Sequence, residues 1–153
     1  MSKLVQHIET AGKESPPPLG FSRKARPPVT PSIVLMASCS DPHVLNGCTP
    51  LPDGILLCPK VPGTAVDPAI VDQLVSLAGN TPWGVNIDAN RVQEMPWLKE
   101  KGCDFLILDS AQIPIGALQD EELGRLLIVS ANLDKEDANT LEELPLDAVI
   151  CSE

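Results

Sequence analysis

Three ionisable side chains stand at the ends of short apolar segments and could carry covalent or acid–base chemistry. They are Lys60, Asp88 and Asp109. A lysine near aliphatic side chains can form a Schiff base or hold an anion, and two carboxylates can share a proton transfer or bind a divalent cation. We therefore treat these three as catalytic candidates, with a small carbonyl or anionic metabolite as the ligand class. The simpler interpretation is a solvated lysine and two aspartates that cap turns.

Other apolar segments end in polar residues that could bind a ligand. In parallel α/β sheets and barrels the carboxyl ends of the strands meet on one side, where the loops converge. The pattern therefore predicts a ligand-binding rim, although strand ends also meet water in any sheet. The residues expected on this rim are Ser38, Asn86, Ser130, Asn132 and Glu153.

Three cysteines and one histidine between residues 39 and 58 could bind a metal ion. Thiolate and imidazole are suitable zinc ligands, but the spacing here is irregular and contains no C-x2-C pair. We predict no cofactor and keep a divalent metal as the alternative, with Cys39, His43, Cys48 and Cys58 as its candidate ligands. The competing interpretation is that Cys58, Cys103 and Cys151 are small buried apolar residues.

Six short apolar runs dominate the sequence after residue 32. They lack the alternation of a half-exposed sheet, so both faces of the predicted strands should be covered, as in a parallel sheet. The runs are 33–37, 55–58, 84–87, 105–108, 126–129 and 148–151.

The segments between the runs have the start and stop residues of short helices. Helices are expected at 3–11, at 67–79, at 90–102 with an interruption at Pro96, and after Asp134; residues 116–124 could form two turns at most. The buried stripe of the helix after Asp134 is expected to consist of Ala138, Leu141 and Leu144.

Alternating strands and helices at a nearly constant step are typical of repeated βα units. With strands that end in Asn86-Ile87-Asp88 and Leu108-Asp109, residues 32–153 resemble the (βα)8-barrel superfamily, in particular its compact sugar-phosphate and aldolase-like members. The resemblance implies parallel strands with a site at their carboxyl ends. Aldolase-like barrels carry their lysine late in the strand order, where this chain has Cys151.

The number of units is too small for a closed barrel. Eight units at this step need about 168 residues, and residues 32–153 number only 122. We therefore predict an α/β domain at 32–153 built as a partial (βα) barrel of about six parallel strands with short crossover helices. The alternative is an open, flavodoxin-like doubly wound sheet. Residues 1–31 should form a separate N-terminal helix and a proline-rich basic arm.

The charge distribution limits the possible partners. The net charge is −10: residues 1–31 contribute +3, and residues 32–153 contribute −13. An acidic body repels phosphate backbones and anionic membranes, which argues against nucleic acid or membrane partners. The basic arm matches the acidic body of a second copy, which favours a homodimer. No apolar segment is long enough to span a membrane. The five cysteines lack the spacing of a disulfide framework, which fits a reducing compartment. A cytoplasmic protein is therefore expected.

No diagnostic catalytic motif is present: the sequence lacks a P-loop, a G-x-G-x-x-G and a G-x-S-x-G. The leading hypothesis is therefore a non-catalytic or degenerate partial barrel that acts through homodimerisation or small-ligand binding. Two alternatives stay open. One is a small lyase or isomerase acting on a carbonyl or sugar-phosphate-like metabolite, and the other is a metal-binding protein.

Overall fold

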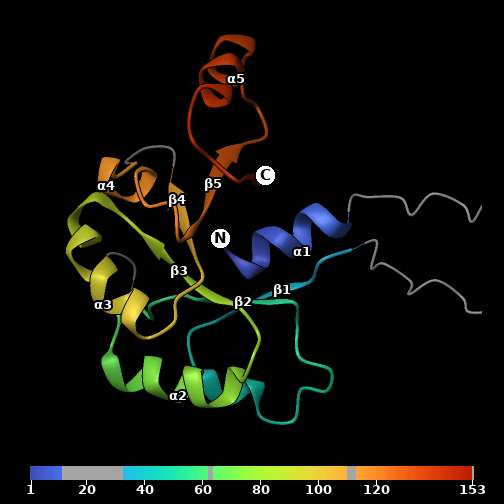
Figure 1. The fold of residues 1–153 in the computed structure, drawn as a ribbon, viewed down its shortest axis with the longest axis vertical. Coiled ribbons are helices and arrows are strands. Elements are labelled where there is room, and N and C mark those ends of the chain that lie inside the picture. Colours follow the sequence, from blue (N-terminus) through green and yellow to red (C-terminus); the bar gives the residue numbers. More distant parts are fainter. Residues whose placement is uncertain (12–32, 62–63, 110–112, 153) are drawn as a thin grey trace, which may run out of the picture.

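The chain forms one sheet of six parallel strands, curled into a half-barrel (Figure 1). The computed structural model describes residues 1–11, 33–61, 64–109 and 113–152. The strands follow the order of the sequence across the sheet. They are β1 (Met36–Cys39), β2 (Gly54–Leu57), β3 (Trp83–Ile87), β4 (Phe105–Asp109), β5 (Gly124–Ser130) and β6 (Ala148–Ser152).

The sequential strand order confirms the partial barrel and excludes the doubly wound alternative. In a doubly wound sheet the strand order reverses at a switch point, and helices then lie on both faces. Here each strand pairs with the next one in the chain, from β1 through β6. Right-handed crossovers between such neighbours all lie on one side of the sheet, which we call the outer face.

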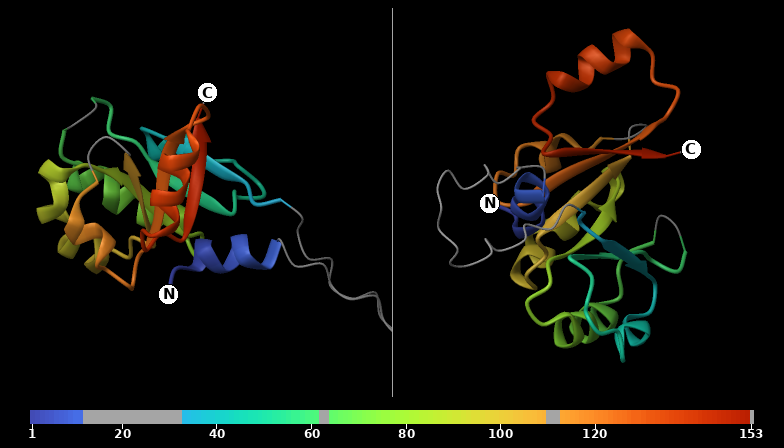
Figure 2. Two further views of the ribbon diagram at one scale, coloured as in Figure 1. Left: turned by 90° about the horizontal axis from the view of Figure 1, so that it is seen from above. Right: turned by 90° about the vertical axis from the view of Figure 1, so that its right-hand side faces the viewer.

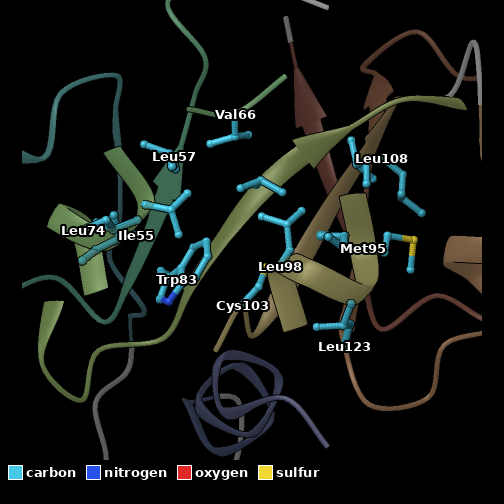
Figure 3. Close-up of a cluster of buried hydrophobic side chains, with 14 of the residues drawn as sticks. Ile55, Leu57, Val66, Leu74, Trp83, Met95, Leu98, Cys103, Leu108 and Leu123 are labelled. Carbon is cyan, nitrogen blue, oxygen red and sulfur yellow. The ribbon is translucent and has the colours of Figure 1, made fainter. Parts of the chain in front are cut away.

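The outer face carries the main hydrophobic core. Its covering elements are η1 (Pro42–Leu45), α2 (Pro68–Ala78), η2 (Ala89–Glu94), α3 (Met95–Glu100) and α4 (Ile115–Leu118). In Figure 3, Ile55 and Leu74 lie together on one side of Trp83, and Leu98 and Cys103 lie on the other. Trp83 is therefore the aromatic centre of a core made mostly of aliphatic side chains.

The opposite face of the sheet, which we call the inner face, carries the N-terminal helix α1 (Lys3–Ala11) (Figures 1 and 2). Leu4 is fully buried there with Phe105, Ile107 and Leu126. Ser2 caps the helix, because its Oγ accepts a 3.2 Å hydrogen bond from the backbone N–H of Val5. The helix predicted at 3–11 is thus confirmed, and its apolar stripe covers one end of the inner face.

Glycines give α1 the room to approach the sheet. A Cβ atom at Gly54 would lie 2.9 Å from Leu4 Cδ1, and one at Gly124 would lie 2.7 Å from Ser2 Oγ. Because real Cβ atoms almost never come this close to other heavy atoms, larger residues at either position would push the helix away. The glycines thus shape the inner face around a helix.

Several local predictions are confirmed. The helix α2 begins after Asp67, whose Oδ1 accepts a 2.9 Å hydrogen bond from Ala69 N, and it ends at Gly79 with φ of 59°. The interrupted helix at 90–102 is observed as η2 followed by α3, with Pro96 in the first turn of α3. In the segment 116–124 the only helical residues are those at the end of the four-residue helix α4 (Ile115–Leu118), which fits the limit of two turns.

Other local predictions are wrong. Strand β1 begins at Met36, three residues later than the apolar run, because the residue register with β2 starts at the pair of Met36 with Gly54 and Ile33 and Leu35 before it are exposed. Helix α5 (Lys135–Glu142) begins after Asp134 as predicted, but its predicted stripe is not buried: Ala138 is exposed, and Leu141 and Leu144 are only half-buried. Figure 1 shows this helix standing apart from the others, beyond β5. Cys151 on the last strand is exposed.

The arm predicted after the first helix falls on residues 12–32, which lie outside the described residues. No helix in the described part of the chain is long and apolar enough to cross a membrane.

Candidate functional site

The curled sheet places several of the predicted ligand-binding residues on one face. Side chains alternate between the faces of a strand, so residues two apart point the same way. Ser38 follows Met36, Asn86 follows Gly84 and Ser130 follows Ile128 on the inner face, at the carboxyl ends of their strands. By the same alternation Asp109, from the catalytic set, and Ser152 belong to this face.

These five side chains form what we call the inner polar rim, made of Ser38, Asn86, Asp109, Ser130 and Ser152. Asn86 is half-buried and the other four are exposed. Because α1 covers the apolar half of the inner face at the other end of the strands, the rim marks the half that is open to solvent. The division is that of a (βα) barrel, with packing at the amino ends and polar groups at the carboxyl ends.

Ser152 was missed by the sequence analysis. The sequence pattern ends the sixth apolar run at Cys151 and predicts Glu153 as its polar residue. The observed register pairs Ser152 with Ser130 and puts both on the inner face. Counting two residues on from Ile150 would have identified it. The predicted Glu153 lies outside the described residues.

Asn132 and Asp88 lie in loops that follow the strands. The backbone N–H of Asn132 donates a 3.3 Å hydrogen bond to Ser130 Oγ. Asp88 is the N-cap of η2, and its Oδ1 accepts a 2.9 Å hydrogen bond from Asn90 N. The capping interpretation of Asp88 thus agrees with its contacts.

Lys60 lies in a pocket of about 250 Å3 at the carboxyl end of β2. The walls come from the end of β2, from the loop that follows it and from the first turn of α2. Apolar walls dominate and a few polar groups converge on them, a composition typical of small-ligand sites. The described lining residues are Ser40, Leu57, Cys58, Pro59, Lys60, Val61, Thr64, Ala65, Val66, Asp67 and Ile70.

The described lining of this pocket has one positive side chain, Lys60, and one negative side chain, Asp67, so an anion would be bound by Lys60 against the repulsion of Asp67. Lys60 is exposed and is the cation among the described lining residues. The carboxylate of Asp67 is engaged in capping α2. Burial raises the pKa of the Cys58 thiol, so this group stays neutral near pH 7. Neither Asp88 nor Asp109 is among the described residues that line the pocket.

A buried ion pair holds one wall of the Lys60 pocket in place. Arg91 is only 5% exposed, and its guanidinium donates to both oxygens of Glu94, at 3.0 and 2.9 Å, and to the backbone oxygen of Asn86 at 3.1 Å. Glu94 in turn accepts a 3.5 Å hydrogen bond from the backbone N–H of Val66, a lining residue. The pair thereby joins the end of β3 to the loop before α2.

Of the four candidate metal ligands, Cys39 and Cys58 are neighbours, because the backbone N–H of Cys58 donates a 2.8 Å hydrogen bond to Cys39 O. Cys39 is buried in the core of the outer face, whereas His43 and Cys48 are exposed. Burial, followed by the nearby Cys58 and Asp41, raises the pKa of the Cys39 thiol, which opposes the thiolate form that binds metals. Within the described residues, no three His, Cys, Asp or Glu side chains group as a metal site requires.

Comparison with known protein families and with curated proteins finds no match for this chain. Any functional assignment therefore has to come from the chemistry of its own side chains.

Proposed function

We propose that the protein binds a small anionic or carbonyl metabolite in the Lys60 pocket and does not transform it. The single observation that supports this is the position of Lys60 in an apolar pocket of about 250 Å3 at the carboxyl end of a strand. A pocket of this size suits a metabolite with a short aliphatic body. Lys60 would bind its carboxylate or carbonyl oxygen, and Ser40 would supply a hydroxyl group.

The contacts and protonation of the ionisable groups in the described lining support a binding role over catalysis. A general acid or base must come within hydrogen-bonding reach of the reacting atom. The thiol of Cys58 is neutral, Asp67 caps a helix, and the two aspartates predicted as catalytic lie outside the lining. Lys60 in this setting acts as an anion-binding group.

Thermal unfolding with pyruvate and 2-oxobutyrate tests the proposal. At ten times its dissociation constant a ligand stabilises the folded chain by about 1.4 kcal/mol, which raises Tm by several degrees. The Lys60→Gln variant should lose most of this rise. Lys135→Gln, which changes an exposed lysine at the start of α5, is the matched control and should respond like the unmodified protein.

Borohydride treatment separates binding from Schiff-base chemistry. In the presence of pyruvate it should leave the mass of the protein unchanged. A covalent adduct on Lys60 would instead support the lyase alternative. An unaltered Tm response in Lys60→Gln would contradict any ligand site at this pocket.

A further inference from the structure

The described sheet has open edges at β1 and β6, and the β1 edge carries the longer exposed apolar run. Ile33 is 70% exposed, Leu35 64% and Met36 39%, with half-buried Val34 between them. On β6 only Val149, at 46%, is a large exposed apolar residue. Consecutive exposed apolar residues on an edge strand are a template for pairing with another chain.

The backbone of this segment has one side available for such pairing. Leu35 faces β2: its carbonyl oxygen accepts hydrogen bonds from Asp53 N at 2.8 Å and Gly54 N at 3.2 Å, and its N–H donates to Asp53 Oδ2 at 2.8 Å. Alternate residues of a strand direct their backbone groups to opposite sides, so Val34 and Met36 direct theirs to the open edge.

The residues from Ile33 to Cys39 also lack the features that protect natural edges. The segment contains no charged residue and no proline. Edge strands that stay unpaired usually carry lysine, proline or a bulge. Here Asp53, the nearest charge in these contacts, is engaged with Leu35 on the β2 side.

We propose that residues 33–35 pair in antiparallel fashion with the same residues of a second copy, around a twofold axis at Val34. In this register each Ile33 lies opposite the partner's Leu35, so the two most exposed apolar side chains of the edge cover each other. Val34 would exchange backbone hydrogen bonds with the partner's Val34. The same patch serves on both copies, as a twofold interface requires.

The distribution of charge identifies the partner as a second copy. The chain leading into this edge is basic, with +3 in residues 1–31, while residues 32–153 carry −13. The two parts of the sequence have opposite charge, so the basic residues of one copy and the acidic residues of another attract each other. The attraction offsets the repulsion between two acidic bodies. The proposal does not depend on the Lys60 pocket.

Sedimentation equilibrium across a wide range of protein concentration tests the pairing. The unmodified protein should dimerise reversibly. Leu35→Lys should raise the dimer dissociation constant by about tenfold or more, because a lysine replaces the apolar contact with the partner's Ile33. Val149→Lys places the same charge on the β6 edge and serves as the matched control, so it should dimerise like the unmodified protein. Circular dichroism checks that each variant is folded.

A second variant tests the strand pairing itself. Val34→Pro keeps an apolar side chain and removes the N–H that faces the open edge, which edge strands tolerate. It should also lose the dimer. Three results would overturn the proposal: a monomeric unmodified protein, equal loss of the dimer in Val149→Lys and Leu35→Lys, or a folded Val34→Pro that still dimerises.

Discussion

The carboxylate of Asp104 anchors Ser2, although 102 positions separate the two residues in the sequence. Asp104 Oδ2 accepts a hydrogen bond from Ser2 Oγ at 2.7 Å and another from Leu4 N at 3.0 Å, and Oδ1 accepts one from Lys3 N at 2.8 Å. The first turn of a helix has unpaired N–H groups and a partial positive charge, so a carboxylate stabilises it. Asp104 immediately precedes β4 and thereby fixes α1 to the sheet.

Replacing Asp104 should release α1 from the inner face. In Asp104→Ala the free energy of unfolding should fall by about 1.5–3 kcal/mol, the range for hydrogen bonds to a charged group. Urea unfolding measures this loss, and hydrogen exchange should show the amides of α1 losing protection first. Asp72→Ala is the control, because the ion pair of Asp72 with Lys101 is exposed and should contribute about 0.5 kcal/mol or less. Equal losses in the two variants would contradict the anchoring role.

Gly84 should not tolerate a larger residue. A Cβ atom there would meet the backbone oxygen and the ring of Phe105 on the neighbouring strand. Gly84→Ala should therefore lower stability by about 1–3 kcal/mol or more. Because the carbonyl oxygen clashes as well as the ring, the double variant with Phe105→Leu should recover little of this loss. Full recovery in the double variant would mean that only the ring limits the space at this position.

The Arg91–Glu94 pair should show strong coupling. Removing one member leaves the other as a buried charge, so Glu94→Gln should lower the free energy of unfolding by about 3 kcal/mol. The double variant Arg91→Met with Glu94→Leu should be less destabilised than the sum of the two single variants, since it leaves no charge unpaired. Additive losses, measured by urea unfolding of the unmodified protein, Arg91→Met, Glu94→Leu and the double variant, would show that the pair does not act as a unit.

Stability should fall in alkaline solution because of Cys103. Burial raises the pKa of its thiol to about 12, from 9.0 in an unfolded chain. Between these values the unfolded chain has released a proton that the folded chain keeps. The free energy of unfolding therefore falls by about 1.4 kcal/mol per pH unit from this group, and the stabilisation is complete only below pH 9.

Urea unfolding at pH 8 and pH 10 measures this dependence. Cys103→Ala should show a shallower decrease than the unmodified protein, whereas Cys48→Ala, which changes an exposed cysteine, should keep the full decrease. The thiols of Cys39 and Cys58, whose pKa values are also raised by burial, account for part of the remainder. An identical slope in Cys103→Ala and the unmodified protein would contradict the burial effect.

The architecture could be predicted because its signals are local. Continuous apolar runs, the Asp67-Pro68 start of α2 and Pro96 in α3 depend on neighbours in the sequence, and all appear in the structure. The helix predicted after Asp134 is present, but its predicted buried stripe was wrong, because Leu141 and Leu144 have helical spacing and too little sheet opposite them to bury them. Periodicity shows which face of a helix is apolar, whereas burial depends on what lies across from it.

The candidate site was only partly predictable. That Ser38, Asn86, Asp109 and Ser130 share a face follows from strand alternation, and the missed Ser152 follows from the same rule. The Arg91–Glu94 pair and the Asp104 contacts could not be predicted, because each depends on the tertiary position of a charge whose sequence neighbours give no sign of it. Lys60 was identified as a candidate, but its pocket depends on where the loop before α2 folds back.

The close approach of α1 to Gly54 and Gly124 limits how this sheet could be extended into a closed barrel. The lumen of an eight-stranded cylinder has room for side chains and none for a helix. Adding two more βα units to this protein would therefore not close the barrel as long as α1 stays packed on the inner face of the sheet. An engineer who wanted closure would have to delete the N-terminal helix and refill both glycine positions with bulky aliphatic residues.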